Sequence, residues 1–373
     1  MSERSSVREG SARGATQLPR RATRLDVGLL SVATAVPPHI ITQREAVQGV
    51  TEVFSSQFTD FARLAAVFVS AGISQRHVAR PFAWYFGNHG WPERTAAYLD
   101  GALALFTEAA QAALDQAGVT ADAVDAVVTV SSTGIATPSL EARALGALGF
   151  RPDVQRVPVF GLGCAGGVAG LAMAADLAMA RPGGVVLLVV VELCSLAVRR
   201  DQATKANMVA LALFGDGAAA AVLTTRPGSA VRVVETGHHT WTDTIDIMGW
   251  QVDPEGFGVI FDQSIPAFAR ERLGPAVDAI LDRQGLRRQD IGRFVCHPGG
   301  RKVVESVEDA LGLEPRSLDH EREILKRFGN MSAPTALFVL ERALQAGLPD
   351  QAMLLALGPG FTVSTATLAR SAA

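Results

Sequence analysis

Apolar runs alternate with helix-like segments along most of this chain. The stretch VFGLGCAGGVAGLAMAADLAMA, residues 159–180, begins as an apolar strand and continues as an alanine-rich helix, with glycines at the junction. The most apolar run, GGVVLLVVVELCSLAV from Gly183, is interrupted by Glu192 and is too short to span a bilayer. It predicts a buried strand. The alternation indicates an α/β protein with mixed, largely parallel sheets covered by helices.

The pattern occurs twice. ALDQAGVTADAVDAVVTVSSTG from Ala113 matches ILDRQGLRRQDIGRFVCHPGG from Ile280, 167 residues later; each is a helix end, a glycine stop, a polar link and a hydrophobic strand. The same offset places Gly163 opposite Asn330 and Cys164 opposite Met331. We therefore predict two similar halves, residues 24–225 and 229–373, whose equivalent strand ends converge near a pseudo-symmetry axis.

The first 23 residues differ in composition from the rest. They are rich in Ser, Arg and Gly and have no apolar signal core, which predicts a mobile tail; an organellar transit peptide is the less favoured alternative.

Composition restricts the function further. The 373 residues are 48% hydrophobic and 19% charged, typical of a well-buried globular protein, and the net charge of −3 gives no reason to expect a nucleic acid partner. The three cysteines form no CxxC pair, which fits a reducing cytoplasm and argues against structural zinc.

Cys164 lies where the predicted strand becomes a helix. One interpretation is a small, buried hydrophobic residue. The other is a nucleophile, because a helix N-terminus lowers the pKa of a thiol.

Two residues of the second half stand at matching positions. His297 follows the apolar strand RFVC and enters the turn HPGG, at the carboxyl end of a strand, where α/β folds bind ligands. Asn330, in FGNMSA, lies at the other predicted strand-to-helix turn, where its alternative role is a helix N-cap. The other histidines favour surface, loop or structural roles: His39, His77, His89, His320 and the pair His238–His239.

Together the three side chains have complementary chemistry. An imidazolium stabilises a thiolate that attacks an acyl thioester. Imidazole and carboxamide donors can hold an enolate oxygen in a dry site.

Five motifs carry a resemblance to a known family. VFGLGCAGGVAGL, ALFGDGAAAAVL, CHPGGRKVVESVEDAL, FGNMSAPTALFVL and LGPGFTVSTATL, in this order from about Arg24 onward, resemble the type III polyketide synthases, the chalcone-synthase-like branch of the thiolase superfamily. The bacterial-type segments GISQRH and WPERTAAYLDGA are similar as well. The resemblance implies a duplicated αβαβα fold and a homodimer, with the helix of CAGGVAGLAMAADLA suited to the dimer seam.

The resemblance also implies roles for residues. Cys164 would accept the acyl starter, while His297 and Asn330 would promote decarboxylation of malonyl-CoA and hold the enolate. Phe214 and Trp250 match gatekeeper positions, and the loop Gly358, Pro359, Gly360 and Phe361 matches the scaffold beside the cyclisation cavity. The expected reaction extends an acyl-CoA starter with malonyl-CoA and then closes a ring; CoA thioesters are the substrates, and no metal or redox cofactor is expected.

Several positions depart from plant members of the family. Of their CoA-binding basic residues this chain keeps Arg63, and Arg301 and Lys302 are alternative phosphate partners or ordinary solvated charges. Thr137 replaces a methionine that reaches into the partner's chamber, and Cys194 and Ala197 replace cavity threonines. With Ala136, these residues predict an apolar channel for a medium- or long-chain fatty acyl starter and an alkylpyrone or alkylresorcinol product; neutral core substitutions are the alternative.

Three other functions compete. A ketoacyl synthase III would perform one condensation on a carrier-protein malonyl group, but its histidine motif usually brings a second asparagine, whereas HPGGRK has glycines. A Cys-His-Asn hydrolase lacks this duplication. A non-catalytic acyl-CoA-binding homologue would have lost part of the triad. Delivery of the starter by an acyl carrier protein remains open.

Overall fold

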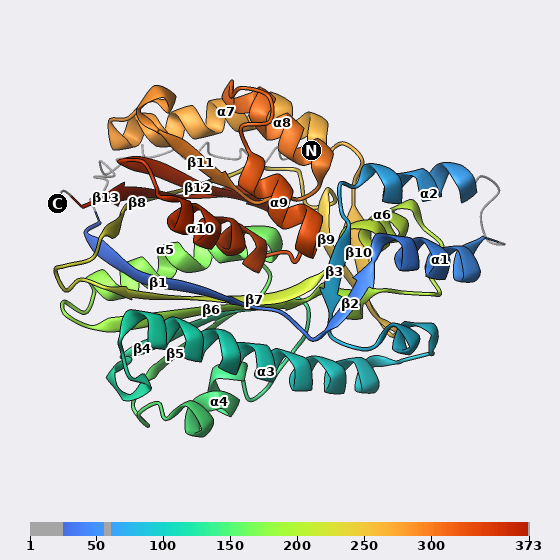
Figure 1. Ribbon diagram of the computed structural model, residues 1–373, viewed down its shortest axis with the longest axis horizontal. Coiled ribbons are helices and arrows are strands. Elements are labelled where there is room, and N and C mark those ends of the chain that lie inside the picture. Colours follow the sequence, from blue (N-terminus) through green and yellow to red (C-terminus); the bar gives the residue numbers. More distant parts are fainter. Residues whose placement is uncertain (1–24, 56–60, 372–373) are drawn as a thin grey trace, which may run out of the picture.

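Five layers make up the molecule (Figure 1). The computed structural model describes residues 25–55 and 61–371, so the tail predicted for residues 1–23 lies outside the described part. From one side to the other the layers are helices, strands, a central pair of helices, strands and helices. The layered αβαβα fold is therefore confirmed.

A nine-stranded sheet supplies both strand layers. Its order is β11-β12-β13-β8-β1-β7-β6-β4-β5. The strands of the first half are β1 (Val27–Ala35), β4 (Ala126–Val130), β5 (Gln155–Val159), β6 (Val185–Leu193) and β7 (Asp216–Thr224). Those of the second are β8 (Val231–Thr240), β11 (Arg293–Cys296), β12 (Gln351–Gly358) and β13 (Thr362–Arg370).

The two halves of the sheet have the same plan. In the first half β4 is parallel to β6, β6 antiparallel to β7 and β7 antiparallel to β1. In the second, β11, β12, β13 and β8 repeat these directions. The halves join where residues 27–29 of β1 pair with residues 231–233 of β8.

The expectation of a largely parallel sheet is wrong. Only β4–β5, β4–β6 and β11–β12 are parallel among the neighbouring strands of this sheet. The reason is visible at β12 and β13, which are joined by a tight turn at residues 359–361. So short a connection can link only antiparallel strands.

The central layer is the helix pair α5 (Gly166–Met179) and α10 (Pro334–Ala346). Both pack into one apolar core that includes residues of the two sheet halves. A side chain at Gly167 would meet the Ala333 carbonyl oxygen at 2.3 Å, so the close approach of the two helix starts requires glycine there. Because α5 is buried inside its own chain, it cannot form the dimer seam suggested from its sequence.

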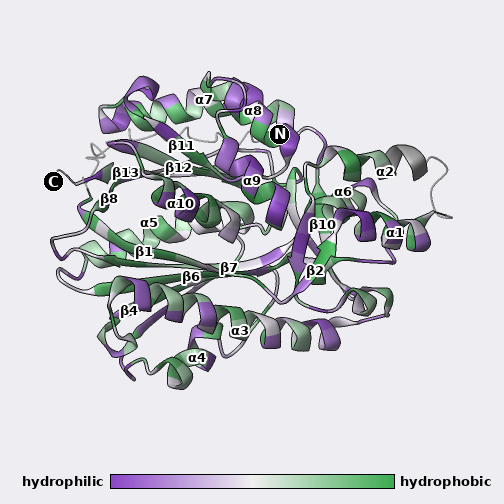
Figure 2. Cartoon of the chain, in the orientation of Figure 1, coloured by the Kyte–Doolittle hydropathy of each residue, from purple (hydrophilic) through white to green (hydrophobic). Residues whose placement is uncertain are grey.

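The outer layers shield the sheet from solvent. On one side lie α3 (Trp91–Ala117) and α4 (Leu140–Leu148); on the other lie α7 (Ile265–Gln284) and α8 (Arg301–Leu311), with α9 (Asp319–Phe328) leading to α10. Figure 2 shows hydrophobic colouring along β1, β6 and α5 and hydrophilic patches on α8 and α9. Within the described residues, no helix has the length and apolar character needed to cross a membrane.

A smaller group of elements lies beside one end of the layers (Figure 1). It contains α1 (Gln43–Phe54), α2 (Phe61–Ser70), α6 (Lys205–Leu213) and two antiparallel pairs of strands. The first pair is β2 (His39–Thr42) with β3 (Gln75–Val78), and the second is the hairpin of β9 (Met248–Asp253) with β10 (Gly256–Phe261). The 3-10 turn η1 (Phe82–Phe86) adjoins this group, and η4 (Cys194–Ala197) follows β6.

Candidate active site

Cys164 occupies the turn that opens α5. It lies in the 3-10 turn η3 (Gly163–Ala165), and two neighbouring loops fix this turn. The Ser132 hydroxyl oxygen accepts hydrogen bonds from the backbone N–H groups of Gly161 (3.1 Å) and Gly163 (3.2 Å). Gly163 has a φ of +46°, and a Cβ there would lie 2.6 Å from the Pro359 ring. Two contacts thus hold the turn in place: Ser132 accepts hydrogen bonds from its backbone, and Pro359 of the loop after β12 packs against Gly163.

His297 follows β11, as predicted, and its backbone N–H donates to the Leu355 carbonyl oxygen at 2.9 Å. The side chain is 6% exposed, and neither ring nitrogen has a hydrogen-bond partner within the described residues. An imidazole held only through its backbone in a buried place has both nitrogens available for a substrate.

Asn330 lies where two chain segments cross. Its backbone pairs with α6 and the residues after it, donating to the Leu213 carbonyl oxygen (2.8 Å) and accepting from Gly215 N–H (3.0 Å). Its side-chain amide donates to the Gly299 carbonyl oxygen (3.1 Å) and accepts from Ser332 N–H (2.8 Å). These contacts fix the carboxamide and leave its second amide hydrogen for the Cys164 sulfur.

The segment before Asn330 corrects one expectation. The residue follows helix α9, not a strand, because DHEREILKRF carries apolar residues at helical spacing among charges. The N-cap of α10 is Ala333, so Asn330 does not cap that helix either.

Cys164, His297 and Asn330 line one cavity. The cavity measures about 20 Å³, and its remaining walls are apolar except for the Gly299 backbone. The structure thus brings the three predicted residues together. Sequence reasoning missed the other lining residues, which come from β9, β10, α7, α8 and β12: Met248, Phe261, Ile265, Gly299, Val303, Val307, Leu355 and Leu357.

Burial disfavours charge on both the thiol and the imidazole. It raises the pKa of Cys164 to about 11, a shift that the Glu192 charge reinforces and hydrogen bonds from Ser332 and Asn330 oppose. It lowers the pKa of His297 to about 4. Burial in this closed cavity therefore opposes the ionisation expected from the helix start. A proton passing from thiol to imidazole would leave the pair without net charge, and the attraction between the two ions would offset part of that penalty.

A buried carboxyl lies behind the nucleophile turn. Glu192, fully buried at the end of β6, accepts hydrogen bonds from Ser132 N–H (2.9 Å) and the Thr133 hydroxyl (2.7 Å). Burial raises its pKa to about 8. Ser132 and Ser332 were not identified from sequence, although Ser332 stands two residues after Asn330 in the motif that identified the asparagine.

A larger cavity adjoins the first. It measures about 660 Å³ and shares Phe261, Gly299 and Val303 with the cavity around Cys164. Arg301 and Lys302 at the start of α8 line it, as does Lys205 at the start of α6, which sequence reasoning missed. Arg301 also lies 4.0 Å from Glu305 and is about half exposed. Arg63 belongs to α2, but its side chain lies outside the described part of the structure.

The two predicted gatekeeper residues contact each other. The rings of Phe214 and Trp250 are 6.2 Å apart and nearly perpendicular, at 77°. The Trp250 indole N–H donates to the Ser132 carbonyl oxygen at 2.8 Å, which ties β9 to the loop behind Cys164. Phe214 forms a bridge with Asn330 through its backbone. The aromatic pair therefore adjoins the triad.

The GPGF loop packs against the turn that carries Cys164. A Cβ at Gly358 would meet Ala165 at 2.6 Å, so the loop packs directly against the nucleophile turn. Phe361 is fully buried and packs its ring on Phe268, 4.6 Å away. The loop is a scaffold for the turn; its residues do not line the cavity itself.

The predicted fatty acyl channel is not formed by its four residues. Ala136 lines a separate surface hollow with Ile135 and Phe160, and Thr137 is exposed. Cys194 and Ala197 are buried in η4 but line none of the cavities described here. The tight 3-10 turn places Ser195 and Val198, not these two, on the nearest apolar cavity.

Three of the remaining histidines have ordinary surroundings. His89 stacks on Trp84, His77 contacts the Pro37 carbonyl oxygen, and His238 contacts the Ser364 hydroxyl. No group of three or more His, Cys, Asp or Glu residues suited to a metal ion occurs in the described parts of the chain.

A layered duplicated α/β fold with a buried Cys-His-Asn cavity beside a basic-rimmed larger cavity defines the class, the type III polyketide synthases. The chain matches the chalcone and stilbene synthase family, in its N-terminal domain over residues 87–227 and in its C-terminal domain over residues 240–372. It belongs to that family.

Relatives agree with this assignment. The chain is 42% identical over 353 residues to a 1,3,6,8-tetrahydroxynaphthalene synthase of Streptomyces peucetius, covering 91% of this chain and 93% of that one. It is 36% identical to a putative chalcone synthase of Bacillus subtilis, covering 90% and 96%. The crystal structure of 1,3,6,8-tetrahydroxynaphthalene synthase from Streptomyces coelicolor superposes with a TM-score of 0.88 at 27% identity, covering 93% of this chain and all of that one.

Proposed function

We propose that this protein builds a polyketide on Cys164 by repeated decarboxylative condensation of malonyl-CoA and then cyclises it to a polyhydroxylated aromatic product. One observation carries the proposal: Cys164, His297 and Asn330 line a single buried cavity that adjoins a larger one with basic residues. The thiol accepts an acyl group, and the two donors serve the enolate.

The chemistry follows from the positions of the donors. The Cys164 sulfur, its proton taken by His297, attacks the starter thioester and expels CoA. Malonyl-CoA then loses CO₂, and the electron pair of the broken bond becomes an enolate whose oxygen His297 and Asn330 hold. The enolate carbon attacks the acyl-cysteine carbonyl, the chain gains two carbons, and the sulfur leaves. CoA thioesters suffice; no metal or redox cofactor takes part.

The larger cavity suits the CoA portion of the substrates. Arg301, Lys302 and Lys205 supply positive charge for phosphates, and the shared residues Phe261, Gly299 and Val303 lead toward Cys164. With the side chain of Arg63 outside the described part, these three cations are the ones that the geometry favours.

We infer that a malonyl unit also serves as the starter. Three curated relatives are named 1,3,6,8-tetrahydroxynaphthalene synthases and others 3,5-dihydroxyphenylacetyl-CoA synthases. Hydroxyl groups on alternate carbons are the pattern that two-carbon units leave. The small cavity at Cys164 also suits a short starter.

A fatty acyl starter, with an alkylpyrone or alkylresorcinol product, is the second candidate. One observation favours it: an apolar cavity of about 80 Å³ that Phe214 lines, next to the aromatic pair. A ketoacyl synthase III reaction with a carrier-protein malonyl group is the third outcome to be tested.

The decisive experiment supplies the purified protein with malonyl-CoA alone, and separately with acetyl-, hexanoyl-, lauroyl-, palmitoyl- or aromatic CoA, and identifies products by mass spectrometry. An aromatic product from malonyl-CoA alone supports the malonyl starter. Pyrones or resorcinols formed only with long-chain starters would replace it by the second candidate. A single extension, and only with an acyl carrier protein, would overturn the polyketide assignment.

We also propose that the protein acts as a homodimer, joined at the edge strand β5. This strand ends the sheet, so no strand of the described part of the chain pairs with its outer side. Phe160 and Ile135 lie near its end and are each 55% exposed, large for apolar side chains. Thr137, in the loop after Ile135, would then face the partner. Light scattering of the wild type and of Phe160→Asp tests this; a monomeric wild type would contradict it.

A further inference from the structure

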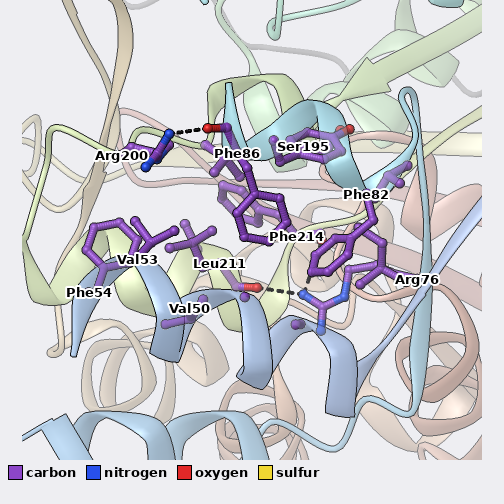
Figure 3. Close-up of a pocket in the computed structure, with 17 residues that line it drawn as sticks. Val50, Val53, Phe54, Arg76, Phe82, Phe86, Ser195, Arg200, Leu211 and Phe214 are labelled. Atoms are coloured by element: carbon purple, nitrogen blue, oxygen red, sulfur yellow. Dashed lines mark hydrogen bonds between the residues drawn. The ribbon is translucent and has the colours of Figure 1, made fainter. Parts of the chain in front are cut away.

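A third cavity lies between α1, η1 and α6 (Figure 3). It measures about 80 Å³ and shares no lining residue with the cavity around Cys164. Most of its walls are apolar, including three aromatic rings that Figure 3 shows close together: Phe82, Phe86 and Phe214. Condensation that starts from malonyl-CoA does not use this cavity; among the reactions considered above, only the fatty acyl alternative would place a substrate tail in it.

A buried cation without a counter-ion lines it. Arg76 is 3% exposed, and its guanidinium donates to the Leu211 carbonyl oxygen (2.7 Å) and to Gln43. Its Nε has no hydrogen-bond partner, and no Asp or Glu of the described segments forms an ion pair with it. Burial lowers its pKa only to about 10, so it keeps its charge at neutral pH. A charge so buried is normally paired with an anion.

A second guanidinium lies at the other side of the cavity. Arg200 donates to the Phe86 carbonyl oxygen, and its Nε also has no partner among the described residues. Figure 3 shows Arg76 and Arg200 on opposite sides of the aromatic rings. The cavity therefore combines apolar walls with positive charge, and none of the described residues that line it is acidic.

We propose that this cavity binds a small amphipathic carboxylate, whose tail packs against Phe82, Phe86 and Phe214 and whose carboxylate neutralises Arg76. Apolar walls provide most of the binding free energy for such a ligand, and one charged contact orients it. A neutral alkyl chain would leave Arg76 unpaired, and an anion without a tail would leave the rings uncovered.

The site is linked to the triad by the backbone. Arg76 lies within 3.5 Å of the Phe214 carbonyl oxygen as well as holding Leu211. The residues on both sides of Phe214 pair with Asn330: Leu213 accepts from its N–H, and Gly215 donates to its carbonyl oxygen. An occupant that restrains Arg76 and the Phe214 ring would therefore restrain the segment that positions Asn330.

The first test measures binding by calorimetry with three probes: octanoate, 1-octanol and acetate. Octanoate is expected to bind at least about tenfold more tightly than either of the others, because only it supplies both tail and charge. In Arg76→Gln the preference for octanoate over octanol should disappear. In Arg200→Gln, the matched arginine at the other side, it should persist.

A second variant keeps the test decisive if Arg76→Gln fails to fold. A Cβ at Gly49 of α1 would meet the tips of the Phe82 and Phe86 rings at 2.8 and 3.1 Å, so Gly49→Ala pushes into the cavity without touching a charge. We expect octanoate affinity to fall about tenfold. The matched control is Gly146→Ala in α4, where a Cβ meets nothing within 4 Å; its affinity should be unchanged.

Carbamidomethylation of Cys164 separates this site from the catalytic cavity. Octanoate binding should survive the modification, whatever the outcome of the condensation assay. Loss of binding on modification, equal affinity for octanoate and octanol, or a preference abolished by Arg200→Gln and kept in Arg76→Gln would each overturn the proposal.

Discussion

The two halves of the molecule share one strand plan but place chemistry at different points of it. At the 167-residue offset, Cys164 corresponds to Met331, a fully buried core residue. His297 corresponds to Val130, also fully buried, and Asn330 to Gly163. Each functional residue thus replaces a packing or turn residue of the other half. A duplicated scaffold brings equivalent turns together. A single side chain at each turn then determines the chemistry of the cavity between them.

The largest effect should come from exchanging the nucleophile. Cys164→Ala is expected to lower product formation by at least about 10³-fold, because no other side chain in the cavity can hold an acyl thioester. Mass spectrometry of the intact protein should show the acyl adduct on the wild type and none on the variant.

Two variants serve as controls for the nucleophile. Met331→Leu changes the equivalent position of the other half, and Cys194→Ala removes a buried thiol that lines no described cavity. Both should retain activity within about tenfold and mainly lower stability. An active Cys164→Ala, or an inactive Cys194→Ala that still folds, would contradict the assignment.

The next largest effect should come from replacing Asn330, one of the two hydrogen-bond donors of the second half. Asn330→Asp keeps the shape of the side chain but removes the amide N–H groups and introduces a carboxylate. We expect about 10²-fold slower release of CO₂ from malonyl-CoA, while acylation of Cys164 changes much less. Equal losses in both steps would indicate a disturbed turn and would remove the specific role of Asn330.

Much of this comparison could be predicted from sequence. The offset was visible because helix, strand and turn lengths are kept between the halves, and His297 and Cys164 stand in glycine-bearing turns that follow β11 and β5. Asn330 was found in spite of a wrong local interpretation: the charged helix α9 precedes it, but its motif is distinctive.

The cavities could not be predicted in the same way. The walls of the cavity around Cys164 come from β9, β10, α7, α8 and β12, which lie far from Cys164 in sequence and meet it only by packing. The prediction that the four candidate residues form a fatty acyl channel was wrong for a related reason. Which side chains of η4 face a cavity depends on a single 3-10 turn, where four residues give no periodicity that could distinguish Cys194 from Ser195.

The pH dependence of alkylation tests whether burial or the helix start controls the ionisation of the Cys164 thiol. With the pKa of Cys164 raised to about 11 and that of His297 lowered to about 4, the free enzyme holds a neutral thiol and a neutral imidazole between these values. The thiolate fraction then grows with pH, so the rate of alkylation by iodoacetamide should rise close to tenfold per pH unit from about pH 7 to pH 9. A rate already constant above about pH 6 would mean that the ion pair exists before substrate binds.

The smallest effect concerns a buried carboxyl behind each catalytic turn. Glu192 supports the first half through Ser132, and Glu321 supports the second by accepting the backbone N–H of Cys296, next to His297, at 2.8 Å. Burial raises their pKa values to about 8 and about 7. The folded state therefore holds these protons more tightly than the unfolded chain does. Their contribution to stability is greatest below the unfolded pKa near 4.5 and is lost as the pH rises to about 7 or 8.

Glutamine in place of either carboxyl should remove that dependence. We expect the Tm of the wild type to fall by a few degrees between about pH 5 and pH 8, and to fall less in Glu192→Gln and in Glu321→Gln. Glu305→Gln, a half-exposed carboxyl on α8, is the matched control and should follow the wild type. If one buried variant flattens the curve and the other does not, only one half uses a protonated carboxyl beneath its turn. The two halves would then share only their backbone plan, because Glu192 and Glu321 would differ in their effect on stability just as the catalytic residues differ in chemistry.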